Sequence, residues 1–189
     1  MNFDNNKNLT HIEIKDEYKR LVTDAVIEDA DTLIMVGLGL AGAYIILGNG
    51  ELRKEFSPKF KGDDAALVNF YRHDMQYKLD HARQLDENTP YKKVFWVVSP
   101  DMCISAARYR IGDEFVNSGA YVMHKRAYLQ AFHESTAGFK KIQFIFHDDK
   151  LSDPLTGFTL DKYKASANIQ DIHCSAEYYK GTVNQIKTL

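Results

Sequence analysis

The sequence predicts an α+β fold, in which a mainly antiparallel mixed sheet packs against three to four helices. Two patterns favour this class. Apolar residues recur at helical spacing over residues 15–30 and 63–87, whereas residues 32–56 hold three short apolar runs separated by glycines. Short strands joined by tight turns pair antiparallel, and helices beside them give a layered α+β structure. The whole chain, residues 1–189, is expected to form a single globular domain.

The first half of the chain contains the clearest patterns. Residues 15–30 are predicted to form an amphipathic helix. Residues 32–36, 43–47 and 51–56 are predicted to form an antiparallel meander, because they are rich in branched aliphatic residues and glycines separate them. Residues 63–87 carry the strongest helical stripe in the chain, and a proline-containing turn ends it.

A central strand is predicted at residues 94–98, which are apolar throughout and are expected to be buried on both faces. Ser99 and Pro100 suit the N-cap and the first position of a following helix, which Gly119 is placed to end. A further helix is predicted at residues 120–134.

The last third of the chain is less strongly patterned. Residues 141–146 are predicted to form a strand, and the polar residues 147–157 form a loop. A short strand at residues 158–160 and a short helix at residues 175–187 are weaker features of an uncertain tail, residues 161–189. At the other end, the first ten residues (1–10) are expected to be loosely ordered.

Charge and composition narrow the functional classes. Lys and Arg number 24 against 26 Asp and Glu, a net charge of -2, which argues against a polyanion-binding surface over the whole protein. The two cysteines, Cys103 and Cys174, fit neither a disulfide framework nor a zinc site, so a reducing compartment is expected. Because the N-terminus also lacks a signal-peptide pattern, we expect a cytoplasmic protein. Glycines interrupt the most apolar stretch, residues 32–48, so we expect no membrane association.

A glycine-rich motif, Gly37-Leu-Gly39-Leu-Ala-Gly42, follows an apolar run and matches the G-x-G-x-x-G pattern of dinucleotide-binding loops. In such loops a helix begins at once, so that its N-terminal amides face the phosphates. The residues after Gly42 are poor helix formers, and the acidic residue expected about twenty positions on has only Asp63 as a candidate. Glycines that turn or bulge strands are therefore the favoured interpretation, and a nucleotide loop is the alternative.

The predicted catalytic residues are His147, Asp148 and Asp149. They stand where the last clear strand ends and a loop begins, which fixes the backbone while the side chains reach solvent. A histidine with two carboxylates serves as a general base with its orienting acid, or begins an oxygen-rich metal site; the sequence leaves the metal and any cofactor unknown. Asp171 and His173 are candidate partners from the tail. The simpler alternative is a polar loop with a turn-forming acid.

The predicted phosphate-binding residues are Arg108, Arg110, Lys125 and Arg126. Each lies close in sequence to a tyrosine. Basic groups gathered beside aromatic rings bind phosphates while a base stacks on a ring, although isolated basic pairs are also common on ordinary surfaces.

A second acidic and histidine cluster comprises His73, Asp74, Asp80 and His81, residue types that hold metals in phosphohydrolases. Helical geometry puts His73 and Asp80 at the centre of the polar face of the predicted helix. A solvated surface is therefore the favoured interpretation.

The segment Ala131–Ile142, in which a helical pattern ends in Gly138-Phe139 before a strand, resembles the ending of GNAT acyltransferases. The resemblance implies acyl transfer. The acetyl-CoA loop of that family follows a central strand, whereas the nearest match here, Arg108 to Gly112, has a different spacing and lies inside a predicted helix. Acyl transfer therefore ranks third among the functional hypotheses, after the two that follow.

Two further hypotheses come from different functional classes. The first is a small intracellular enzyme that acts on a phosphorylated or nucleotide-like ligand. In this hypothesis His147, Asp148 or Asp149 takes part in acid/base or metal chemistry. The second is a non-enzymatic interaction or assembly subunit, because the Tyr and Phe residues, 11 of each, cluster after residue 90 and aromatic rings are enriched in binding hot spots. It would bind a protein partner or form a homo-oligomer. Nucleic acid stays open as a partner, and a membrane is not expected.

Overall fold

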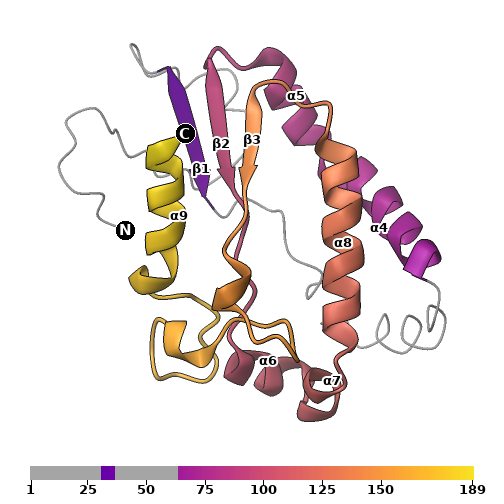
Figure 1. The fold of residues 1–189 in the computed structure, drawn as a ribbon, viewed down its shortest axis with the longest axis vertical. Coiled ribbons are helices and arrows are strands. Elements are labelled where there is room, and N and C mark those ends of the chain that lie inside the picture. Colours follow the sequence, from indigo (N-terminus) through magenta and orange to yellow (C-terminus); the bar gives the residue numbers. More distant parts are fainter. Residues whose placement is uncertain (1–30, 37–63) are drawn as a thin grey trace.

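The computed structural model describes residues 31–36 and 64–189, which form a small sheet covered by helices (Figure 1). The strands are β1 (Thr32–Val36), β2 (Lys93–Val97) and β3 (Ile142–Ile145). The helices are α4 (Asp64–Lys78), α5 (Asp80–Asn88), α6 (Ile104–Ile111), α7 (Asp113–Asn117), α8 (Ala120–Thr136) and α9 (Ala176–Thr188), with 3-10 turns η1 (Asp149–Leu151) and η2 (Asp161–Tyr163).

The sheet is parallel throughout, so the predicted antiparallel mixed sheet is wrong and the described part of the chain is α/β. The strand order is β1-β2-β3, and both neighbouring pairs are parallel. Parallel neighbours need a crossover connection, and helices supply it here: α4 and α5 precede β2, and α6 to α8 precede β3. The strand at residues 32–36 is confirmed, but its partner is β2. The other predicted elements of the first half, residues 15–30, 43–47 and 51–56, lie outside the described residues.

The two faces of the sheet are covered by different helices. Along β2, Val94 and Trp96 belong to the large core that includes α4 and α8, whereas Phe95 and Val97 pack with Ile186 of α9 on the opposite face. This alternation is the two-residue period of a strand that is buried on both sides, as predicted. Figure 1 shows α4 and α8 lying side by side, with α9 on the other side of the strands.

The predicted helix at residues 63–87 is found as two helices, α4 and α5, which meet at Leu79. From α5 the buried carboxylate of Asp86 accepts hydrogen bonds from the backbone N–H groups of residues 140, 141 and 142 at 2.7–3.1 Å. Asp86 therefore fixes the point at which the chain enters β3.

The predicted helix that starts at Ser99 and runs to Gly119 begins later and is interrupted. Residues 99–102 are not helical, the extended backbone of Cys103 pairs with Thr159, and the helix starts at residue 104. Gly112, with a φ of 89°, then separates α6 from α7. A single L-residue rarely adopts that conformation, so glycine breaks the helix there.

The later elements follow the prediction more closely. The helix at residues 120–134 is confirmed as α8, the strand at residues 141–146 as β3, and the helix at residues 175–187 as α9. Residues 158–160 form isolated bridges through Thr159 in place of a strand. Within the described ranges, the helices fall short of the length and apolar character that crossing a membrane requires.

Candidate functional site

The candidate site lies at the carboxyl edge of the sheet. The last residues of the three strands are paired in register, β1 with β2 and β2 with β3, so the strands end together. From this edge the chain continues with the glycine-rich residues 37–42, with residues 98–101 and with His147. Open parallel sheets bind their ligands outside the carboxyl ends of the strands, and in this fold that position is the edge where β1, β2 and β3 end at residues 36, 97 and 145.

Asp101 follows β2 and forms a largely buried ion pair with Lys125 of α8. The Nζ–Oδ2 distance is 2.8 Å, and the two side chains are 12% and 22% exposed, respectively. The hydroxyl of Tyr121 donates to the other carboxylate oxygen, and the hydroxyl of Thr159 donates to the Asp101 main-chain carbonyl at 2.6 Å. A buried carboxylate needs such partners, since an unpaired charge there is strongly destabilising.

Lys125 is committed to contacts within the protein. Besides Asp101, its ammonium donates to the Ser152 hydroxyl at 3.3 Å and to the Gly157 carbonyl at 3.1 Å. These three acceptors match the three donors of an ammonium group. The predicted phosphate ligand Lys125 thus joins α8 to the loop after β3 and presents no spare donor.

His147 is also held by hydrogen bonds on both ring nitrogens. Nε2 lies 2.7 Å from the Val98 carbonyl, and Nδ1 lies 2.8 Å from the Thr182 hydroxyl. A carbonyl only accepts, so Nε2 carries the proton and Nδ1 accepts from Thr182. Burial lowers the pKa of His147 below its ordinary value, against the opposing effects of the Val98 carbonyl and Asp101. The ring is therefore neutral and joins the ends of β2 and β3 to α9.

The two carboxylates after His147 point to solvent. Asp148 is exposed, and its side chain accepts from the Lys150 backbone N–H at 2.9 Å to cap η1. This is the turn-forming role that the simpler alternative gave to an acid in this loop. Asp149 is exposed within η1.

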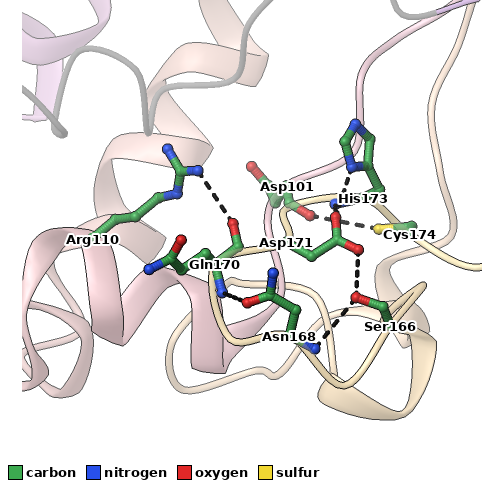
Figure 2. A network of polar contacts seen from close by, with 8 residues as sticks. All are labelled: Asp101, Arg110, Ser166, Asn168, Gln170, Asp171, His173 and Cys174. Atoms are coloured by element: carbon green, nitrogen blue, oxygen red, sulfur yellow. Dashed lines mark hydrogen bonds and ion pairs between the residues drawn. The ribbon is translucent and has the colours of Figure 1, made fainter.

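The predicted tail partners form a separate pair. His173 Nδ1 lies 2.6 Å from Asp171 Oδ1, and the Ser166 hydroxyl donates to the other oxygen at 2.7 Å (Figure 2). The hydrogen bond from Ser166 and those from His173 lower the pKa of Asp171 to about 2. Because His147 bonds to Val98 and Thr182, it is not joined to this pair by a hydrogen bond.

Two of the three remaining predicted cations, Arg108 and Arg110, have partners of their own. Arg108 pairs with Asp113 at 3.4 Å and also donates to Asn117. Arg110 donates to the Gln170 carbonyl at 3.2 Å, as Figure 2 shows, and Arg126 is exposed on α8. A pocket of about 390 Å³ is lined by Arg108 together with Ser105, Tyr109, Asp113 and Ile169.

A larger pocket of about 520 Å³ lies beside His147, between the residues after β3 and the first turns of α9. Its wall combines Tyr163 and Tyr178 with polar groups from Asp148, Gln185 and the ion pair of Lys180 with Glu177. The wall therefore mixes aromatic surface with charged groups of both signs.

The other candidate residues remain apart from this edge. His73, Asp80 and His81 are exposed on α4 and α5, in agreement with a solvated face, and Asp80 pairs with Arg83 at 2.8 Å. Within residues 31–36 and 64–189, no group of three or more His, Cys, Asp or Glu side chains is arranged to hold a metal ion. Gly37, Gly39 and Gly42 lie outside the described residues.

Asp101 and Tyr121 are the polar residues of this edge that the sequence analysis did not single out as site residues. One signal was present, because Asp101 follows the predicted central strand by three residues, where side chains of a parallel sheet meet. The expected antiparallel pairing concealed it. Tyr121 and Lys125 come from a helix that only the crossover brings back to this edge.

Comparison of the chain with known proteins adds no relative: no protein-family model, curated protein sequence or solved structure matches it.

Proposed function

We propose that the protein binds a nucleotide-like, phosphorylated ligand at the carboxyl edge of its sheet and acts on it there. The observation that carries the proposal is the parallel pairing of β1 with β2, directly ahead of Gly37-Leu-Gly39-Leu-Ala-Gly42 in the chain. Glycines that leave the carboxyl end of a parallel strand let backbone amides approach a phosphate closely. The antiparallel meander in which these glycines were expected to turn the chain is not the pairing that β1 makes in the described sheet.

The pocket beside His147 supports the same ligand class. It opens where β3 ends, at the edge to which the glycine motif is attached. Tyr163 offers aromatic surface for a base, and the positive charge of the same wall is that of Lys180, which is ion-paired with Glu177.

The exposed carboxylates of Asp148 and Asp149 are the acid/base or metal-binding groups of this proposal. His147 is a poor general base, because both of its ring nitrogens are already bonded within the protein. Phosphate charge would be met by backbone amides of the glycine motif and by exposed cations, since Lys125 is engaged with Asp101.

Binding is tested by the thermal unfolding midpoint, measured with ATP, NAD+ or sodium phosphate at millimolar concentration. A ligand present at roughly 100 times its Kd should raise Tm by about 5–10 °C. The variant Gly39→Val should lose this rise, because a branched side chain keeps the backbone away from phosphate. Gly138→Ala is the matched control, since open space surrounds Gly138 beyond the end of α8.

The outcomes separate the parts of the proposal. A shift with a nucleotide but not with phosphate supports nucleotide binding, and no shift with any of the three ligands refutes it. Turnover is measured as nucleotide hydrolysis by chromatography, and Asp149→Asn should retain the thermal shift while product formation stops. Binding without any product in the wild-type chain would reduce the function to that of a binding protein.

The interaction-subunit hypothesis receives no specific support. Most of the described aromatic rings in the second half of the chain build the core, among them Tyr121, Tyr128, Phe132 and Phe158. Tyr109, at 57% exposed, is a single surface ring on α6.

A further inference from the structure

Cys103 occupies the N-cap position of α6, close to the carboxyl edge of the sheet. Its side chain is fully buried, and its backbone pairs with Thr159. Its thiol stands at the amino end of an eight-residue helix, where the helix dipole favours negative charge.

Cys174 reaches the same place from the other end of the chain. Its backbone pairs with Lys164, its side chain is 8% exposed, and its sulfur lies 4.0 Å from the carbonyl oxygen of Asp101 (Figure 2). The two buried thiols pack together in a small cluster with Tyr178. Two residues 71 positions apart, the only cysteines of the chain, are thus brought into contact.

The contact distinguishes the two sulfurs chemically. The hydrogen bond from Cys174 lowers the pKa of the Cys103 thiol against the effect of burial, and Lys164 adds to the lowering. The same hydrogen bond and burial raise the pKa of Cys174. Cys103 is therefore the better nucleophile, because the thiolate is the reactive form.

We propose that Cys103 and Cys174 form a reversible peroxide-sensitive dithiol that closes into an intramolecular disulfide. The inference does not depend on the proposed nucleotide-binding function. Hydrogen peroxide is the oxidant class that fits, since a small neutral molecule reaches buried sulfurs that larger disulfides do not.

The reaction proceeds in two balanced steps. The Cys103 thiolate attacks one peroxide oxygen and breaks the O–O bond, which gives a sulfenic acid at Cys103, and the leaving hydroxide takes up a proton to become water. The Cys174 sulfur then attacks the Cys103 sulfur, and the sulfenic oxygen leaves as a second water. Two thiols and one peroxide thus give one disulfide and two waters, with two electrons passing from sulfur to peroxide.

The full-length reduced chain is treated with hydrogen peroxide, quenched with catalase, denatured and alkylated with N-ethylmaleimide. The untreated chain should take two maleimide adducts and the oxidised chain none. Trypsin should release residues 94–108 joined to residues 165–180, each of which holds one cysteine between cleavage sites. A phosphine reductant should restore both adducts. The oxidised chain should also melt about 5–10 °C above the reduced chain, because the bond closes a long loop.

Two single variants test the order of the steps. In Cys174→Ser the sulfenic acid at Cys103 has no resolving thiol, so dimedone should label residues 94–108. In Cys103→Ser, residues 165–180 should stay unlabelled. Labelling in the reverse pattern overturns the assignment of the attacking sulfur.

Three results on the wild-type chain overturn the proposal itself. They are two maleimide adducts that persist after peroxide, sulfinic acid without joined peptides, and disulfide-linked dimers in place of the internal bond.

Discussion

The imidazole of His147 joins three segments, because it follows β3 and bonds to the residue after β2 and to α9. Replacing His147 with Ala removes both hydrogen bonds and the ring contact with Tyr178, and leaves the Val98 carbonyl without its donor. We expect the free energy of unfolding, measured by urea titration, to fall by about 2–4 kcal/mol. Asp149→Ala, an exposed neighbour, should stay within about 0.5 kcal/mol of the wild type. Equal effects of the two substitutions would contradict this structural role.

His124 determines part of the loss of folding stability at acid pH. It is 1% exposed on α8, its Nδ1 lies 2.8 Å from the Tyr71 hydroxyl oxygen, and burial lowers its pKa from 6.5 to about 4. Between these two values the unfolded chain binds a proton that the folded protein does not, so the free energy of unfolding falls as the pH falls. We expect this one group to account for a loss of about 3 kcal/mol between pH 7 and about pH 4.

Urea titrations across this pH range provide the measurement. His124→Gln should be less stable than the wild type at neutral pH, but it should lose less stability on acidification. His133→Gln, an exposed position on the same helix, should keep the wild-type dependence. A His124→Gln protein with the wild-type slope would show that this ring does not control the acid response.

Local patterns identified polar residues at a strand end but not their bonding. His147 does follow β3, as predicted. Its partners, Val98 and Thr182, lie 49 and 35 positions away and belong to a different strand end and to α9. The contact between Cys103 and Cys174 has the same origin. Such pairings depend on how the crossovers return the chain, and no local period reports that.

At the scale of elements, the start of β3 depends on α5 through Asp86. Although burial raises the pKa of the Asp86 carboxyl, hydrogen bonds from three backbone N–H groups lower it overall. Asp86→Ala should reduce the free energy of unfolding by about 2–4 kcal/mol, since buried donors lose a charged acceptor. The exposed neighbour Glu87→Ala should change it by less than about 0.5 kcal/mol. A similar small loss for Asp86→Ala in urea titrations would show that β3 starts without this contact.

Element type was more predictable than element boundaries. The apolar stripe of α4 and the branched run of β2 were strong enough to be found from sequence alone. The start of α6 was misplaced because Ser99 and Pro100 match a helix start, whereas Cys103 is extended and pairs with Thr159, and the Asp101 side chain bonds to Tyr121. Gly112 was read as part of a helix, although its φ of 89° ends one.

At the scale of the whole molecule, the main error of the sequence-based prediction was the relative direction of the strands. Residues 32–36 were correctly assigned as a strand, but the glycines after them suggested a turn to an antiparallel neighbour. The actual neighbour, β2, lies about sixty residues along the chain and pairs with β1 in parallel register. Strand direction is set by the connection between two strands, and a helical crossover of this length is what permits the parallel arrangement.

The shared direction of the strands separates two tasks within the described fold. Packing and backbone pairing are fixed at the amino edge and along the faces, where Asp86 and the α4–α8 pair act. The exposed segments beyond the carboxyl edge, such as residues 165–170, make few demands on that interior. A substitution or an insertion in those segments can therefore alter what the surface recognises while the strands keep their register. New binding specificities can then evolve at little risk to folding.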